Sequence, residues 1–580
     1  MKTITAQEIQ TWKSLEDPAD PGKVLKNPLL KERIEEIVTY RGDRTKPCQM
    51  PTLYFHDYVE FEKSGNRLIY EEPYFFKRSL LVTRGLVAWL YPNEKESDIT
   101  SLADVMWSIC DEYTWALPVH VHGELETDHY TVDLFAAETA GCLAELLHYV
   151  PALPEPVKER VRAEIFRRVL TPFLTQKEKF PFENMENNWC AVCGGSVGIA
   201  ALYLLEDPKQ LEIVLNRVGE SMDRFLNSFS ADGACLEGLS YWTYGMSFFV
   251  SYCELLYRRS GGQVDLMASE RVHQIARFQQ QCYFPGGRTI SFSDGSTRDH
   301  FYLGLTSYLR RYYGDIAIPP RACMASYTDD SCYRWATLFR DLIWSDSEIE
   351  DWTQDAVSVF PDAQWWILRD GDKGIAAKGG HNGEPHNHND IGSFLIYRGE
   401  EELLADLGAG EYTKQYFREE TRYQIFCNGS QGHSVPEIQG QGQEAGAAYR
   451  AEDVQMGEKS FSLEMAGAYP AGTVKSLRRT LDYESSGHLV LTDTFVFDED
   501  SQSVRERFVS RKPIRQGDQK GEIWIGDMRV CCSDGISVME GKTVCQKDHK
   551  GEDEMVYVAE FLAHPQQKDT AYTYRFDFYF

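Results

Sequence analysis

The stretch HNGEPHNHNDIGSFLIYRGEEELLADLGAGEYTKQYF, residues 381–417, says most about the fold of this chain. His386, His388 and Asp390 are spaced two apart, and an apolar run and the acid of LLADLG follow directly. Residues two apart on a β-strand point to one face, so a strand here would present three polar side chains together. Such a face is too polar for a packed core, and imidazoles with carboxylates suit Zn²⁺ or a similar divalent ion. The plainer interpretation is a polar loop with surface histidines.

The sequence beyond about residue 360 predicts antiparallel β-sheets. Short runs bounded by Gly, Asp and Asn alternate apolar with polar residues and are rich in β-branched and aromatic side chains. This texture is typical of a β-sandwich. Examples are QWWILRD, SFSLEMAGAY, SLRRTLDYE, HLVLTDTFVF, VRERFVS and TYRFDFYF.

The sequence before about residue 350 has a helical pattern instead. Short loops marked by Pro, Gly and Asp separate many apolar segments in succession. We therefore expect an all-α domain over residues 1–350 and an antiparallel β-sandwich over residues 351–580. Apolar residues recur at i, i+3, i+4 and i+7 in segments such as 133–150, 154–174 and 194–207.

Length and composition bound the number of domains and the kind of partner. A chain of 580 residues is too long for one ordinary hydrophobic core. Its 60 Lys and Arg against 89 Asp and Glu give a formal net charge of −29, which argues against nucleic acid or an anionic membrane as the main partner. A polyanionic substrate would need a locally basic cleft, or would be short. The aromatic share of 13% fits either large cores or a cleft that stacks rings against sugars.

The sequence predicts neither a secretion signal nor a membrane span. The first residues lack an apolar stretch and a small-residue cleavage site, and no segment approaches the roughly 20 apolar residues of a span. The 14 cysteines are scattered rather than arranged as a disulfide framework. We expect a cytoplasmic protein with reduced thiols, although a mature secreted or periplasmic form would have a similar sequence. The oligomeric state is left open.

The pattern H-x-H-x-D-x-G-x-F, followed by an apolar strand and L-x-D-x-G-x-x-x-Y, resembles the start of the sandwich domain of heparinase II/III-like polysaccharide lyases. Those enzymes join an incomplete (α/α) toroid to an antiparallel β-sandwich, so the resemblance implies an α+β multidomain chain. It also implies a structural zinc ion bound by His388, Asp406 and His433. His386 takes the place of a histidine that acts on the substrate, and the zinc would fix the loop that presents it.

A second match to the family lies in ENNWCAVCGGSVGIAAL, residues 186–202. An Asn before an apolar helix usually caps it, which is the plain interpretation of Asn187. The resemblance implies that the amide of Asn188 binds the substrate carboxylate, with Asn187 and Trp189 beside the substrate. Several family members have His where this chain has Trp189, and this difference removes one candidate base.

A third match is DGACLEGLSYWTYGMSFFVSY, residues 232–252. Tyr241 and Tyr244 share a face if the segment is a helix, and such a pair is more often part of a core than catalytic. In the family a tyrosine here is the acid and sometimes also the base. The resemblance implies this role for Tyr244 or, as second choice, Tyr241. Glu237 and Trp242 are expected at the substrate.

Two weaker matches complete the expected site. His120, His122 or His129 would line the cleft, because their segment resembles another helical region of the family. Arg298 would contact a sugar carboxylate. The turn before a helix explains the sequence around Arg298 equally well.

Together, the matches predict a lyase that cleaves a uronic-acid-containing glycan by β-elimination. An amide and a histidine would neutralise the uronate carboxylate, a base would remove the C5 proton, and an acid would protonate the O4 leaving group. Candidate substrates are heparin or heparan sulfate, hyaluronan, chondroitin and alginate. A glycoside hydrolase on the same scaffold would use two carboxylates, such as Glu237 and Asp294. A non-catalytic sugar-binding protein is the third interpretation, favoured by Trp189 in place of His.

Overall fold

A computed structural model describes residues 3–15, 19–40, 49–92, 96–121, 130–349, 352 and 354–580. The chain forms two compact units, which we call the helical unit and the sandwich unit. The helical unit comprises Met1–Ser228, Thr243–Ala276 and His300–Trp352, and the sandwich unit comprises Phe229–Trp242, Arg277–Asp299 and Thr353–Phe580. The expected domain boundary between residues 350 and 351 falls on residues outside the described ranges and stays a prediction.

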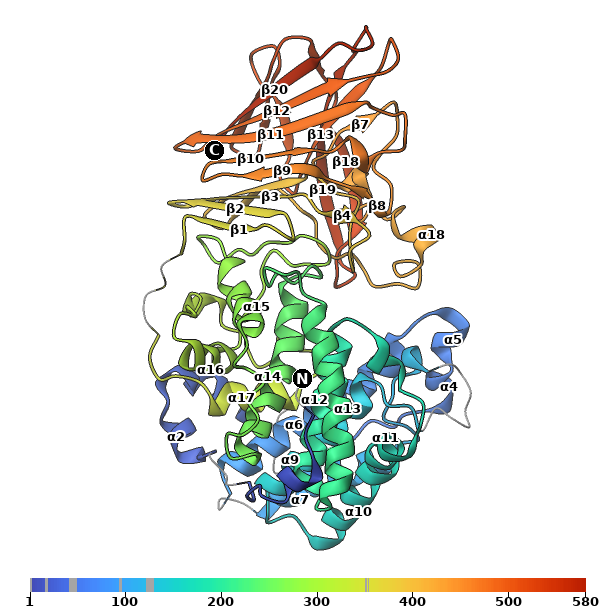
Figure 1. Ribbon diagram of the computed structural model, residues 1–580, viewed down its shortest axis with the longest axis vertical. Coiled ribbons are helices and arrows are strands. Elements are labelled where there is room, and N and C mark those ends of the chain that lie inside the picture. The colour runs from blue at the N-terminus through green and yellow to red at the C-terminus, as the bar shows by residue number, and fades with distance from the viewer. Residues whose placement is uncertain are drawn as a thin grey trace. The chain divides into compact units, whose positions relative to one another are not determined.

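Helices follow one another in the helical unit, as the apolar spacing predicts (Figure 1). The predicted helix 133–150 is α9 (Leu134–Tyr149), which Asp133 caps by accepting a hydrogen bond from the backbone N–H of Ala136. The segment 154–174 forms α10 (Glu155–Ile165), a π-helical turn and α11 (Thr171–Thr175). The other helices begin with α1 (Ala6–Ile9), α2 (Pro21–Lys26), α3 (Lys31–Thr39), α4 (Phe55–Tyr58), α5 (Glu60–Ser64), α6 (Leu68–Leu90) and α7 (Glu96–Cys110). They continue with α12 (Asn188–Leu204), α13 (Pro208–Asn227), α14 (Leu239–Arg259), α15 (Glu270–Gln281), α16 (Leu303–Tyr313) and α17 (Trp335–Ile343).

Helix α12 is buried over most of its length because glycines let its neighbours approach. A Cβ at Gly198 would lie 2.4 Å from the ring of Tyr252 in α14, and one at Gly195 would lie 3.1 Å from the backbone oxygen of Phe248. Glycine is therefore required where α12 packs against α14. None of the helices in the described ranges is both long and apolar enough to cross a lipid bilayer.

The sandwich unit consists of antiparallel sheets, and the predicted β-sandwich is confirmed. The first strands are β1 (Val357–Phe360), β2 (Trp365–Asp370), β3 (Lys373–Lys378), β4 (His381–Asn382), β5 (Phe394–Arg398), β6 (Glu401–Leu404), β7 (Glu437–Ile438), β8 (Gly446–Arg450), β9 (Glu452–Met456) and β10 (Ser460–Glu464). The later strands are β11 (Ser476–Ser485), β12 (His488–Val496), β13 (Val504–Ser510), β14 (Ile514–Gln516), β15 (Glu522–Ile525), β16 (Met528–Cys532), β17 (Ile536–Val538), β18 (Lys542–Lys547), β19 (Asp553–Ala563) and β20 (Tyr572–Tyr579). The short helix α18 (Glu419–Arg422) lies between β6 and β7 in the chain.

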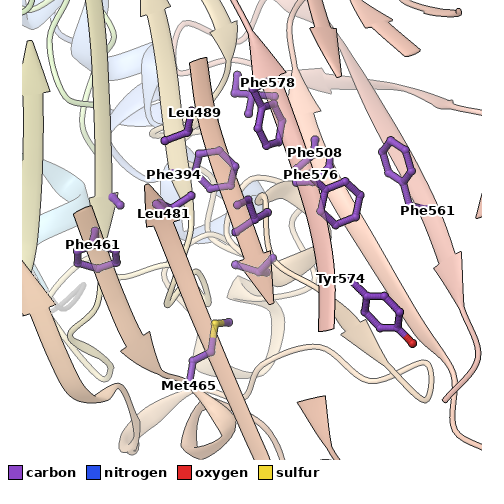
Figure 2. Packing of buried hydrophobic residues seen from close by; sticks show 14 of the residues in the cluster. Phe394, Phe461, Met465, Leu481, Leu489, Phe508, Phe561, Tyr574, Phe576 and Phe578 are labelled. Carbon is purple, nitrogen blue, oxygen red and sulfur yellow. The ribbon is translucent and has the colours of Figure 1, made fainter. Parts of the chain in front are cut away.

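The largest sheet has the strand order β14-β15-β16-β20-β12-β11-β10-β9. Two others have the orders β1-β2-β3-β5-β6 and β17-β19-β13-β7, with β18 beside β19, and β4 pairs with β8. Alternate apolar residues of the strands pack in one core, where Figure 2 shows a group of aromatic rings. The ring of Phe508 meets those of Phe576 and Phe578 edge-on, each at 5.0 Å between centroids.

Residues 383–393 form a loop between β4 and β5, so the strand considered for this segment is wrong. His386 has a φ of 54°, a left-handed conformation that an extended strand excludes. Asp390 does not join the two histidines, because its carboxylate pairs with the buried ammonium of Lys378 at 2.9 Å. Because this segment is a loop with turns rather than a strand, these residues do not share one face.

Candidate functional site

His386 lies between two carboxylates in the sandwich unit. Its Nδ1 is 2.5 Å from Oδ2 of Asp294, and its Nε2 is 3.5 Å from Oε2 of Glu237. The His386 side chain keeps 26% of its surface exposed, whereas that of Asp294 is completely buried. Burial opposes a charge on His386, but the hydrogen bond and the negative charge of Asp294 outweigh it and raise the pKa of the imidazole.

Tyr241 belongs to the same cluster. Its ring centroid is 4.8 Å from that of His386, and its hydroxyl oxygen is 2.5 Å from the hydroxyl of Tyr412. Tyr412 donates its only proton to Oδ2 of Asp294 at 3.0 Å, so Tyr241 is the donor to Tyr412. Burial and the charge of Asp294 raise the pKa of Tyr241, and the phenol stays protonated.

A cavity of about 440 Å³ in the sandwich unit is lined by His386 and its neighbours. This volume lies within the range of about 300–1,000 Å³ that is common for ligand pockets. Arg422 supplies a positive charge to the wall and is fixed there, because it donates to Oδ1 of Asp294 at 3.2 Å and to the carbonyl oxygen of Asn387 at 3.1 Å. Glu384 adds a carboxylate, so the cavity combines both charges with amide groups.

Three fully buried side chains beside this cluster form a group that fits a metal ion. One ligand atom from each of His388, Asp406 and His433 lies within 4.8 Å of the others. Among the described residues, Nδ1 of His388, Nδ1 of His433 and Oδ2 of Asp406 have no hydrogen-bond partner. The Nε2 atoms are used instead, since that of His433 is 2.8 Å from the carbonyl oxygen of Cys427 and that of His388 is 3.1 Å from Asp294. Zinc-binding histidines are commonly held through the second nitrogen in this way.

The pKa shifts of His388 and Asp406 also suit metal ligands. Burial lowers the pKa of His388, and a neutral imidazole is the form that binds metals. Burial opposes the ionisation of Asp406, but the neighbouring imidazoles of His433 and His388 outweigh it and lower the pKa of the carboxyl. Asp406 in turn raises the pKa of His433 against the effect of burial. Two imidazoles and a carboxylate are a set of ligands typical of Zn²⁺.

Tyr244 forms a second cluster, in the helical unit. Its hydroxyl donates to Oε1 of Glu138 at 2.6 Å, and the guanidinium carbon of Arg334 lies 4.1 Å from the centre of its ring. Burial raises the pKa of Glu138 to about 7, although Arg334 and the Tyr244 hydrogen bond act against it. Burial and the charge of Glu138 raise the pKa of Tyr244. The cluster therefore holds a protonated phenol next to a carboxyl group that titrates near neutral pH.

Asn188 lies near Tyr244 in the helical unit. It is the first residue of α12 and is buried, and its Cβ is 3.4 Å from where a Cβ on Gly245 would lie. Asn187 caps α12 by accepting a hydrogen bond from the N–H of Trp189 at 3.0 Å, as the plain interpretation predicts. The close packing of α12 and α14 thus places Asn188 against Gly245, the residue that follows Tyr244 in the chain.

Comparison with known families agrees with the geometry of the sandwich unit. The family described as Heparinase II/III-like, C-terminal, matches residues 353–546, which include His386 and all three members of the buried group. Residues 353–546 are thus similar to the C-terminal domain of the heparinase II/III-like family. The motif in residues 381–417 predicts a resemblance to the heparinase II/III-like family, and this comparison confirms it.

Solved structures share the fold of nearly the whole chain. Heparinase III is 14% identical, with a TM-score of 0.66 over 99% of this chain and 88% of that chain. The heparan sulfate lyase HepC from Pedobacter heparinus is 12% identical, with a TM-score of 0.61 over 99% and 86%. The chondroitin AC lyase from Streptomyces coelicolor A3 is 11% identical, with a TM-score of 0.51 over 99% and 82%. No curated protein matches the sequence. The predicted fold class, a helical toroid followed by the heparinase II/III-like sandwich, is confirmed.

The histidine segment, one of the two weaker sequence matches, falls in the helical unit. The ring of Trp189 stands edge-on to that of His120 at 4.7 Å between centroids. His120 is held by the carboxylate of Asp133 at 2.7 Å, so it has a fixed place at the start of α9. His122 and His129 lie outside the described residues.

The remaining predicted residues are in the sandwich unit with the heparinase II/III-like domain. Trp242 is fully buried, which is typical of a core residue rather than of a substrate contact. Arg298 is half exposed, and its guanidinium pairs with Glu400 at 2.9 Å. These contacts do not place either residue in the His386 cluster.

Several residues of the site were not predicted in the roles that the structure gives them. The sequence predicts a role for Asp294 only as one of the two carboxylates of a hydrolase, and it predicts none for Arg422, Glu138 and Arg334. The sequence holds one signal for Asp294: it lies in a Ser-Asp-Gly turn, where Ser293 takes a φ of 60°. This turn does not indicate that the partner of Asp294 is His386, which is 92 residues away.

Zinc in the heparinase II/III-like domain stays a prediction that metal analysis can check. We expect about one zinc ion per purified chain, and we expect His433→Ala to lose it because three ligands become two. Elemental mass spectrometry and the shift of thermal unfolding on adding a chelator measure both effects. His381→Ala, a histidine nearby in the sequence and outside the buried group, should keep its zinc. A wild-type protein without stoichiometric metal would contradict the assignment.

Proposed function

We propose that this protein is a polysaccharide lyase that cleaves a uronic-acid-containing glycan by β-elimination. The observation that carries the proposal is His386, which is held between Asp294 and Glu237 and lines a cavity in a heparinase II/III-like domain. The proteins with the same fold include lyases named for heparan sulfate and chondroitin. Both glycans contain uronic acids, and they are the first substrates to test.

In the proposed reaction, Nε2 of His386 removes the proton from C5 of the uronate. The electron pair of the C5–H bond forms the C4=C5 double bond, the C4–O4 bond breaks, and Tyr244 transfers its proton to O4. The amide of Asn188 hydrogen-bonds the uronate carboxylate and stabilises the enolate-like intermediate. For the opposite configuration at C5, the phenolate of Tyr244 is the alternative base.

Tyr244 is preferred over Tyr241 as the acid because of its neighbour. Glu138, with a pKa of about 7, can return a proton to the Tyr244 phenolate. Tyr241 is linked through Tyr412 to Asp294. The pKa of Asp294 is well below its usual range, because hydrogen bonds from His386 and His388 outweigh the effect of burial, so Asp294 has no proton to give.

The same property of Asp294 disfavours the hydrolase alternative. A glycoside hydrolase needs one carboxylic acid that donates a proton and one carboxylate. Asp294 is ionised, so it cannot be the acid. Its side chain is completely buried and both of its oxygens already accept hydrogen bonds, so it is also poorly placed to act on a sugar as the carboxylate partner of Glu237. The zinc proposed at His388, Asp406 and His433 has a structural role and takes no part in proton transfer.

The experiment that tests this function follows the product. The protein is incubated with heparin, heparan sulfate, hyaluronan, chondroitin and alginate oligosaccharides, and ultraviolet absorbance of the unsaturated uronate is recorded. A rise in absorbance together with new reducing ends supports the lyase. New reducing ends without absorbance indicate a hydrolase, and binding without either indicates a sugar-binding protein.

The pH dependence of kcat/KM should report on Glu138. Its carboxyl, whose pKa is about 7, must be protonated to resupply Tyr244, so kcat/KM should fall as the pH rises through this value. Glu138→Gln is neutral at all pH values, and its profile should lack this fall. Arg334 and Asp330 face the same carboxyl and are unchanged in the variant. Deprotonation of His386, the proposed base, should add a rise with pH that is present in the wild type and in Glu138→Gln alike. A fall through this pH that persists in Glu138→Gln would contradict the role of Glu138.

A further inference from the structure

Asp294 joins the buried metal-binding group to His386 through one carboxylate. Oδ1 lies 3.1 Å from Nε2 of His388, and Oδ2 lies 2.5 Å from Nδ1 of His386. We infer that Asp294 is a positioning residue, which sets the tautomer and orientation of His386 and is itself held by the metal-binding His388. This inference rests on the proposed function, because it concerns the tautomer in which Nε2 of His386 can act as the base.

The hydrogen bonds around Asp294 determine which nitrogen of each ring carries its proton. Five groups donate to the carboxylate: His386 and Tyr412 to Oδ2, and His388, Tyr416 and Arg422 to Oδ1. An ionised carboxylate only accepts, so each ring must present an N–H to it. In its neutral form, His386 is then protonated on Nδ1 and has its lone pair on Nε2, the nitrogen that faces Glu237. His388 is protonated on Nε2 and keeps its lone pair on Nδ1 for a metal.

The backbone around this carboxylate supports a positioning role. Ser293 and His386 have φ values of 60° and 54°, a conformation that residues with a Cβ rarely adopt. Such conformations persist where the surrounding structure enforces them. The turn that carries Asp294 is also hydrogen-bonded to the metal-binding residue Asp406. Ser291 donates its hydroxyl to the carbonyl oxygen of Asp406 at 2.9 Å.

The substitution Asp294→Asn tests the inference with little change in shape. An amide has one acceptor oxygen and a donor nitrogen, so it cannot accept from both rings. We expect kcat to fall by about 10³- to 10⁴-fold with KM nearly unchanged, as when a histidine loses the carboxylate that fixes its tautomer. We also expect the affinity for zinc to fall by about 10- to 100-fold, because His388 loses its outer hydrogen bond.

A spectroscopic measurement separates this role from a general structural one. ¹⁵N chemical shifts of labelled histidines, assigned with His386→Gln, should show one tautomer of His386 in the wild type and a mixture in Asp294→Asn. Tyr416→Phe is the matched control, because it removes a donor to the same carboxylate without a ring nitrogen. It should keep the single tautomer and lose far less activity. If Asp294→Asn does not fold, the wild-type shifts still test the inference, because it requires neutral His386 to carry its proton on Nδ1.

The outcomes distinguish this inference from the proposed function. An Asp294→Asn protein with wild-type kcat, zinc affinity and imidazole shifts overturns the inference, and so does wild-type protein in which neutral His386 carries its proton on Nε2. A wild-type protein without lyase activity on any uronate glycan overturns the function instead. In that case the imidazole shifts still test whether Asp294 sets the tautomer.

Discussion

Tyr244→Phe is expected to lower kcat by about 10²- to 10⁴-fold, the range for loss of a general acid. KM should change little, because the ring of Tyr244 and its contact with Arg334 remain and only the hydroxyl is lost. That hydroxyl is the donor to Glu138 and the proposed proton source for O4. Initial rates of ultraviolet absorbance on the glycan that the wild type cleaves measure the effect.

Tyr241→Phe is the matched control for this experiment. It removes a hydroxyl three residues earlier in α14, whose proton is directed to Tyr412 rather than to a carboxyl that can return it. We expect its rate to stay within about tenfold of the wild type, below the range of a general acid. The opposite ranking of the two variants would assign the acid to Tyr241. Wild-type turnover in both variants would end the tyrosine mechanism.

Arg479→Met should destabilise the protein by about 3–5 kcal/mol, the cost of leaving buried charges without their partner. Arg479 in β11 has no exposed surface and lies 2.6 Å from the carboxylate of Asp493. It also donates to the carbonyl oxygens of Gly392 at 2.8 Å and Ser434 at 2.7 Å, beside the loops that carry His388 and His433. Urea unfolding followed by circular dichroism gives the free energy of unfolding.

The neighbouring residue of the same strand provides the control. Arg478 points to the other face and pairs with Asp453 at 2.5 Å, and both side chains are partly exposed. An exposed pair contributes at most about 1 kcal/mol, so Arg478→Met should cost far less. Equal losses of unfolding free energy in the two variants would contradict a larger contribution from the buried Arg479.

The fold was largely predictable because the local apolar patterns of helices and strands recur along the chain. Apolar spacing located α9 to within a residue, and alternation located the strand that begins at Ser476. The loop that contains His386 was not predictable in the same way, since its conformation depends on a left-handed backbone that no local pattern indicates. The assignment of Phe229–Trp242 and Arg277–Asp299 to the sandwich unit was also missed, because it depends on contacts between distant segments.

The candidate site was predictable only where the family motif covers it. The motif indicated His388, Asp406 and His433, and the structure brings their ligand atoms together. Asp294 and Glu138 were missed because each meets its partner across a long separation: Asp294 is 92 residues from His386, and Glu138 is 106 residues from Tyr244. Their local sequences resemble ordinary turn and helix residues.

The two contacts of Arg479 with Gly392 and Ser434 have a consequence for how the protein recovers from chelation. They attach both histidine-bearing loops to the sandwich core without help from an ion. The loops should therefore keep their shape when the site is stripped, and reloading should need no refolding, which removes an ordering cost from rebinding. Reconstitution is then expected to be as quick as diffusion into the site and loss of ligand protons permit.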